Sequence, residues 1–275
     1  MKLRLYHHHD GARVAYRESG TGPPLVLLHS KFLSHREFEP IVEPLADRYR
    51  LILPDLPLHG DSEDRPRHPY TLDWLAEVIA AFCTETAGPR PLVGGHDLGA
   101  QILLRALELR VITPGRLVLM PNPMHRPAPR EQWRTAARLG AVPGLRRALT
   151  HIARAHYRPE RGVKLSVNAE PAARDLLRHA FADVGGNVNL ARSWARFAKR
   201  WPAGPRRELL DLYPHLDFPV LLLWADTDRR HPLQAAEEAL DLLPDGQLRV
   251  LSDTGFLMAY DDAVGVAREL AAFCG

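Results

Sequence analysis

The sequence has few of the features that mark disulfide-rich, metal-binding or membrane-spanning proteins. Its only cysteines, Cys83 and Cys274, are too few and too far apart for a disulfide framework or a metal knuckle. No apolar run is long enough to span a bilayer, and the N-terminal residues lack the apolar core of a signal peptide. A phosphate-binding loop, a dinucleotide fingerprint and a metal-ligand cluster are absent as well. We therefore expect a cytoplasmic protein that uses no cofactor and no metal.

The charge balance gives no sign of a macromolecular partner. The 275 residues include 36 Lys and Arg against 33 Asp and Glu, so the formal net charge is only +3. Neither a basic patch for nucleic acid nor a cationic membrane surface follows from such a balance. The expected partner is a small-molecule substrate, and the oligomeric state stays open, with a homodimer among the options.

Short apolar runs alternate with helical stretches along most of the chain. The strand-like runs are 23–30, 50–55, 90–95, 115–121, 219–226 and 247–252, and the helical stretches are 71–86, 99–109, 233–243 and 261–273. Strands that alternate with helices predict an α/β fold, with a mostly parallel, doubly wound sheet. Alternating residues around the Asp10-Gly11 turn signal predict an N-terminal hairpin.

The alternation stops in the middle of the chain. Residues 122–213 are helical in pattern, rich in Arg and interrupted by Pro, so they predict a helical lid inserted between core segments 1–121 and 214–275. In the stretch LARSWARFAKRW, aromatic and basic side chains fall on different helical faces. The aromatic residues are Trp194, Phe197 and Trp201, and the basic ones are Arg192, Arg196 and Arg200. The basic face is either solvated or a collar for an anionic substrate.

The stretch LVGGHDLGAQ has the spacing of a strand, a sharp turn and a helix. Gly95-x-Asp97-x-Gly99 matches the pattern that raises a nucleophile between a strand and a helix. Side chains at the two glycine positions would collide with the neighbouring strand or helix. The turn therefore predicts that Asp97 is presented at the carboxyl end of the sheet, beside a helix N-terminus that stabilises negative charge.

Together these segments resemble the α/β-hydrolase superfamily over essentially the whole chain. Asp in GHDLGA resembles the nucleophile of the epoxide hydrolase and haloalkane dehalogenase branch, and LLLWADTD resembles the segment that carries the triad acid, here Asp228. The resemblance implies that Asp97 attacks carbon and that a His-activated water cleaves the resulting ester. It also implies an oxyanion hole made by the backbone N–H groups of Lys31 and Leu98.

The chain departs from the family in the oxyanion loop and after the nucleophile. The family usually has His-Gly-x-Pro where this chain has His29-Ser30-Lys31-Phe32. Lys31 either brings a cation to the site or is an exposed lysine that contributes only its amide. Leu98 has no N–H donor in its side chain for a halide, unlike the Trp common in dehalogenases, so halide release is disfavoured.

The largest departure is the missing histidine base. The family places it after the last strand, but here Gly255 is followed directly by Phe256, and no histidine follows His231. His231 comes just after Asp228 and is expected at the mouth of the site. His125, at the start of the lid, is the preferred stand-in, while His96 is expected to point away from the site.

Three functions remain open at this stage. The first is hydrolysis of an epoxide or related apolar electrophile by Asp97 with a non-standard base. The second is cyclisation, isomerisation or elimination (a cyclase, isomerase or lyase) with Asp97 as general acid or base, its pKa raised by burial. The third is a ligand-binding protein without catalysis. The predicted substrate pocket comprises Ser30, Phe32, His125, Trp194 and Phe256.

Overall fold

The structure, a computed structural model, is built around one sheet of eight strands. It describes residues 1–65, 67–127, 135, 138–139, 142, 165–168, 171–182, 188–202 and 204–275. The strand order is β1-β2-β4-β3-β5-β6-β7-β8. The antiparallel pairs are β1 with β2 and β2 with β4, and all other neighbours are parallel. The predicted mostly parallel α/β sheet is therefore confirmed.

The strand bounds follow the predicted apolar runs closely. The strands are β1 Lys2–His7, β2 Arg13–Ser19, β3 Pro24–Leu28, β4 Arg50–Pro54, β5 Leu92–Gly95, β6 Arg116–Leu119, β7 Val220–Ala225 and β8 Gly246–Leu251. The central strands are buried on both faces, as a parallel sheet between helices requires. The two edge strands differ, because β1 is mostly exposed and β8 leaves Gln247, Arg249 and Val250 exposed.

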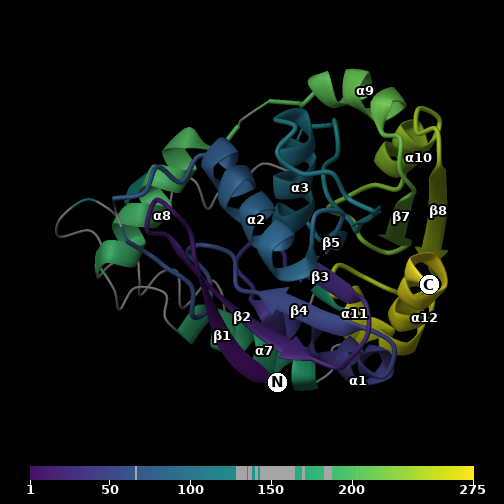
Figure 1. Cartoon of the computed structure of the whole chain (residues 1–275), viewed down its shortest axis with the longest axis horizontal. Helices are drawn as coiled ribbons and strands as arrows, with labels where there is room; N and C mark the ends of the chain where they lie inside the picture. Colours follow the sequence, from purple (N-terminus) through teal and green to yellow (C-terminus); the bar gives the residue numbers. More distant parts are fainter. Residues whose placement is uncertain are drawn as a thin grey trace.

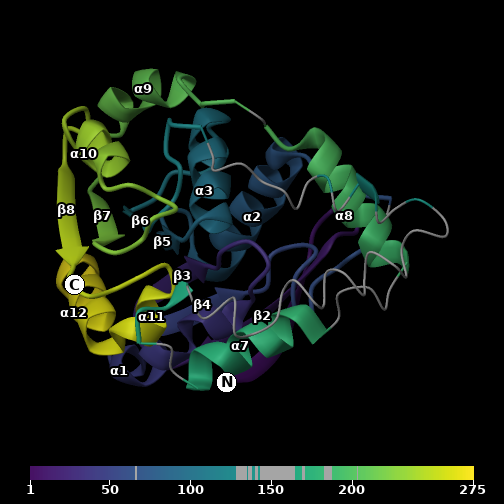
Figure 2. The ribbon, with the colours of Figure 1, turned by 180° about the vertical axis from the view of Figure 1, so that it is seen from behind.

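Helices cover both faces of the sheet. Along the chain they are η1 His35–Ile41, α1 Val42–Ala46, α2 Leu72–Ala87, α3 Leu98–Glu108, α7 Pro171–Ala182, α8 Val188–Arg200, α9 Glu208–Leu212, η3 Tyr213–His215, α10 Gln234–Leu240, α11 Met258–Asp261 and α12 Ala263–Cys274. Figure 1 shows α2 and α3 side by side over the sheet. Figure 2 shows α1, α11 and α12 gathered near the C-terminus.

Strand β3 shows how the two faces share one run of apolar residues. Val26 and Leu28 belong to the core that includes α2 and α3. Leu25 and Leu27 belong to the core that includes α1 and α12. Successive strand side chains point to opposite faces, so a continuous apolar run can fill both layers. The carboxyl ends of these parallel strands then lie at one edge, where ligands bind in open α/β sheets.

Only part of the predicted lid, residues 122–213, lies within the described residues, and that part includes α7 and α8. Helix α8 is attached to the loop before α2: Ser193 Oγ donates to the carbonyl of Asp64 at 2.7 Å. Arg200 donates to the carbonyl of Pro69 at 2.9 Å, and Arg196 to that of His68 at 3.4 Å. Two of the three arginines on this face therefore bind core backbone rather than forming a collar. No helix in the described part of the chain is long and apolar enough to cross a membrane.

Candidate active site

The turn between β5 and α3 holds Asp97 in a strained backbone conformation. Asp97 has φ +43°, in the left-handed region that residues with a side chain rarely adopt. A Cβ at Gly95 would lie 2.5 Å from the amide nitrogen of Ala100. A Cβ at Gly99 would lie 2.3 Å from the carbonyl oxygen of Leu28. The glycine spacing is thus required by the close approach of strand, turn and helix, and Leu98 opens α3 directly after Asp97.

The loop after β3 supplies a backbone donor to this carboxylate. The Lys31 N–H donates to Asp97 Oδ2 at 3.2 Å. Phe32 has φ +71°, and its N–H donates to His59 Nε2 at 3.0 Å. This oxyanion loop also touches α8, since the Phe32 ring centroid is 4.9 Å from that of Trp194. Of the predicted residues, Lys31 therefore contacts Asp97 directly, and Phe32, the next residue, packs against Trp194.

The imidazole of His231 lies between the carboxylates of Asp97 and Asp228. Its Nδ1–H donates to Asp228 Oδ2 at 2.8 Å. Its Nε2 is 3.7 Å from Asp97 Oδ1, a charge contact too long for a direct hydrogen bond. The His231 and Asp228 side chains are 2% and 1% exposed, and that of Asp97 is 11% exposed. The order Asp97–His231–Asp228 is that of a nucleophile, a base and an acid that orients the base.

The spacing between Asp228 and His231 is a signal for this histidine in the sequence. Asp228 and His231 are three residues apart in one turn after β7, so acid and base can bond within a single loop. The carbonyl of His231 is held by Trp224 Nε1 at 2.9 Å. Phe256, which follows Gly255 where the family histidine is expected, stacks beside the His231 ring at a centroid distance of 5.8 Å. An aromatic ring therefore packs beside the imidazole from the position where the resemblance predicted a histidine.

The other candidate histidines are bound elsewhere. His125 was the preferred stand-in and a predicted pocket residue, but its Nε2 pairs with Glu238 Oε2 of α10 at 2.9 Å. His96 directs Nδ1 to the buried carboxylate of Glu37. Neither ring contacts Asp97 in the described structure, because each is held by a carboxylate of another element.

Glu37 connects the oxyanion loop to the elbow. Its Oε2 accepts the Ser30 N–H at 2.6 Å and the Ser30 hydroxyl at 2.9 Å, while its Oε1 accepts from His96. Ser30 was predicted to line the substrate pocket, but its side chain is fully buried and faces Glu37. Because Glu37 takes the Ser30 amide, the next amide, that of Lys31, is the one that faces Asp97.

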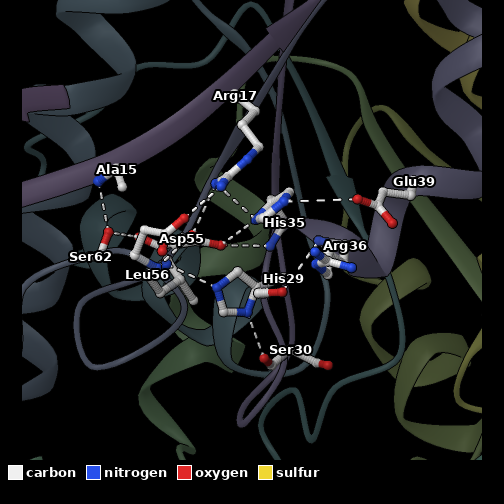
Figure 3. Close-up of polar contacts among 12 residues, drawn as sticks. Ala15, Arg17, His29, Ser30, His35, Arg36, Glu39, Asp55, Leu56 and Ser62 are labelled. Carbon is white, nitrogen blue, oxygen red and sulfur yellow. Dashed lines mark hydrogen bonds and ion pairs between the residues drawn. The ribbon is translucent and has the colours of Figure 1, made fainter. Parts of the chain in front are cut away.

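A second buried carboxylate anchors the base of the same loop. Asp55 Oδ1 accepts the backbone N–H and Nδ1–H of His35, each at 2.8 Å, and Arg17 lies 3.4 Å from Oδ2 (Figure 3). Burial alone would raise the pKa of Asp55, but its bonds to His35 outweigh burial and lower it to about 2. His29 accepts from the Leu56 N–H at 2.9 Å, so the start of the loop is fixed to the same segment.

Opposing charges set the protonation of the three central groups. Burial would raise the pKa of Asp97, but Lys31, His231 and Arg230 together hold it well below its ordinary value of 3.8. Burial would lower the pKa of His231, but Asp228 and Asp97 outweigh it and raise the pKa above 6.5. The His231 contact likewise lowers the pKa of Asp228 against the effect of burial. The two carboxylates thus favour the charged form of the imidazole that lies between them.

This electrostatic arrangement contradicts one expectation from the sequence. We expected burial to raise the pKa of Asp97 toward neutrality against the opposite effect of Lys31, but Lys31 and the neighbouring cations outweigh burial and the pKa is lowered. A carboxylate that stays ionised is suited to nucleophilic attack rather than proton donation. In the described part of the chain, no group of three or more His, Cys, Asp or Glu side chains is arranged to hold a metal ion.

Comparisons with known proteins agree with this architecture. Residues 23–263 match the model of the alpha/beta hydrolase fold family. The magnesium-chelatase 30 kDa subunit of Rhodobacter capsulatus is 28% identical over 246 residues, which cover 86% of this chain and 81% of that protein. The pimeloyl-[acyl-carrier protein] methyl ester esterase of Xylella fastidiosa is 26% identical over 252 residues, covering 86% of this chain and 88% of that protein.

Solved structures give the same picture of the fold. An alpha/beta hydrolase fold protein from Burkholderia ambifaria superposes with a TM-score of 0.80 at 24% identity, covering 100% of this chain and 98% of that one. The enol-lactonase from Burkholderia xenovorans LB400 superposes with a TM-score of 0.75 at 20% identity, covering 98% of this chain and 99% of that one. At such identities the similarity concerns the fold, so the chemistry has to be argued from the residues of this chain.

Proposed function

The chain belongs to the alpha/beta hydrolase fold family, and on that premise we propose that it hydrolyses an electrophilic small molecule, an epoxide in the first place, through a covalent ester on Asp97. The observation that carries this proposal is the alignment of three side chains. Asp97 stands on the elbow, His231 Nε2 lies 3.7 Å from it, and Asp228 holds the other imidazole nitrogen at 2.8 Å.

The identity of the nucleophile favours attack at saturated carbon. Ester-cleaving members of this fold place a serine at the elbow, in the motif G-x-S-x-G. A carboxylate that attacked an ester carbonyl would form an anhydride, whereas its attack on an epoxide carbon forms a stable alkyl ester. Because this chain has Asp97 at the elbow, we assign it alkyl transfer followed by hydrolysis.

In the first step, Asp97 Oδ1 attacks the epoxide carbon. The carbon–oxygen bond of the ring breaks, its electron pair goes to the epoxide oxygen, and that oxygen takes up a proton from solvent. The other oxygen, Oδ2, becomes the ester carbonyl and keeps its hydrogen bond from Lys31 N–H, at 3.2 Å in the free protein. This donor is already aimed at the atom on which negative charge develops in the second step.

In the second step, neutral His231 takes a proton from water, and the resulting hydroxide attacks the ester carbon of Asp97. The tetrahedral intermediate expels the alcohol oxygen, which takes the remaining carboxyl proton, so the diol leaves and Asp97 is ionised again. Asp97 in its charged form contributes to the raised pKa of His231. Once Asp97 is esterified, that contribution disappears and His231 becomes easier to deprotonate at the stage where a base is needed.

The test is a single turnover in water labelled with ¹⁸O, with enzyme in excess over a styrene-type epoxide. The expected result is ¹⁸O in the Asp97 carboxylate, located by peptide mass spectrometry, because water attacks the enzyme ester. Label in the diol alone would refute the covalent route. Binding without turnover of any epoxide tested would favour the alternative of a non-catalytic ligand-binding protein.

A further inference from the structure

Arg230 is a charged side chain beside the site that the mechanism above does not use. It stands between Asp228 and His231, and its backbone N–H donates to Asp228 Oδ1 at 2.8 Å. Its guanidinium carbon lies 5.2 Å from the centroid of the Phe256 ring. The same ring stacks beside His231. Phe256 therefore contacts both the exposed guanidinium of Arg230 and the imidazole that faces Asp97.

The nearby carboxylates are already engaged. Asp228 uses Oδ1 for the Arg230 backbone and Oδ2 for His231. Asp97 uses Oδ2 for Lys31 and turns Oδ1 toward His231. Within the ranges that the structure describes, the Arg230 guanidinium makes no ion pair. A guanidinium that lies over an aromatic ring keeps the N–H donors in its own plane available, in a fork that matches a carboxylate.

We propose that Arg230 binds a carboxylate on the substrate, so that the enzyme selects electrophiles that carry an acid group at one end. This inference rests on the proposed function, since it names the substrate class of the same site. Asp97 is largely buried whereas Arg230 is exposed. The reactive carbon thus enters first, and the acid group stays at the solvent side, paired with Arg230. The charge of Arg230 also acts on Asp97, which agrees with its position at the site.

The experiment compares two substrates that differ only in charge. One is an epoxide with a terminal carboxylate, and the other is the corresponding primary amide. R230Q is measured against the wild type and against R229Q, a control at the neighbouring exposed arginine. Because a charge-assisted bidentate pair is strong, R230Q is expected to lower kcat/KM for the acid by about 10- to 100-fold, mainly through KM. The amide should lose much less than the acid, because the effect of the Arg230 charge on Asp97 is common to both substrates and cancels in their ratio. R230K should recover part of the lost preference for the acid.

Three outcomes overturn the proposal. If R230Q slows the acid and the amide equally, Arg230 stabilises the leaving oxygen instead of recognising the substrate. If R229Q causes the same loss for the acid as R230Q, the effect is one of general surface charge. A wild type that shows no preference for the acid would also contradict it.

The covalent mechanism and the acid subsite can fail separately. Absence of ¹⁸O in Asp97, together with loss of acid preference in R230Q, would refute the mechanism and leave the subsite standing. Label in Asp97 without a preference for the acid would support the covalent mechanism and refute the acid subsite. If neither epoxide turns over, calorimetric binding of the acid and amide forms of the corresponding diol decides. Tighter binding of the acid that R230Q abolishes supports the subsite, and equal binding refutes it.

Discussion

Replacing His231 by alanine should separate the two halves of the proposed reaction. Asp97 stays ionised through Lys31 and Arg230, so it can still attack carbon. The base that activates water is gone, so the ester on Asp97 is expected to persist. The variant should therefore consume one equivalent of epoxide and then stop, with its mass increased by that of the substrate.

The size of the effect follows from what His231 does in the structure. Loss of a triad member lowers turnover by about 10⁴-fold, which corresponds to roughly 5 kcal/mol of transition-state stabilisation. The substitution also leaves the Asp228 carboxylate, 1% exposed, without its imidazole partner. Breaking such a buried pair costs about 3–5 kcal/mol of folding stability. We expect the lower end of this range, because the Arg230 N–H still binds Oδ1.

Intact-protein mass spectrometry and thermal unfolding measure the two effects separately. The double variant D228N/H231A serves as a control, because it removes the unpaired charge and should regain stability without regaining turnover. Wild-type turnover in H231A would refute the assignment of His231 as the base. Absence of an adduct in a folded, stable H231A protein would count equally against Asp97 as a nucleophile.

Four further predictions concern pH (two of them), the elbow and the loop anchor. Hydrolysis of the isolated ester should accelerate as pH rises through the pKa of His231, since only neutral imidazole accepts a proton; the rate is read by stopped-flow. The Asp228–His231 pair should stabilise the fold most between about pH 3.8 and 6.5. Its contribution is lost at lower pH as Asp228 protonates and at higher pH as His231 deprotonates, which thermal melts against D228N/H231A would show. Gly99→Ala should destabilise by about 3 kcal/mol in denaturant melts, because its Cβ would lie 2.3 Å from a backbone oxygen of β3. Gly204→Ala, with no atom within 4 Å, is the matched control. Glu37→Ala should slow ester formation and cost about 2–3 kcal/mol, since it leaves buried donors unsatisfied; unchanged single-turnover rates would contradict the link between Glu37 and the oxyanion loop.

The parts of the site that are local in sequence could be predicted from it. The elbow depends on two glycines within five residues, so its steric requirement can be read from spacing alone, and the glycine contacts agree with it. The alternation of apolar runs and helical stretches likewise predicted the sheet. Strand β8 looked like a buried strand, yet it lies at the edge of the sheet and is largely exposed, which is a property of its neighbours rather than of the segment.

The proposed base, His231, was harder to predict from the sequence than the elbow. The direction of a side chain depends on how distant segments of the chain meet. His125 and His231 looked alike in sequence as histidines at the carboxyl ends of strands. Glu238, far along the chain, binds the first, and Asp228, three residues away, turns the second toward Asp97. The prediction that Ser30 lines the substrate pocket failed for a similar reason, because its hydrogen-bond partner Glu37 lies in η1. Polar contacts of this kind are visible only once the fold is known.

The placement of Asp228 and His231 in one turn has a consequence for how this site can change. The acid and the base move with the same four residues, so a shift of the segment after β8 does not separate them. The segment after β8 contributes the Phe256 ring, which packs beside His231, and it contributes no titratable group to the proposed proton transfer. In the proposed mechanism, this loop can therefore change in shape and length, and so adapt to new substrates, without removing a group that transfers a proton. Conversely, the four-residue turn is a unit that could be transplanted into a related scaffold together with its aromatic support.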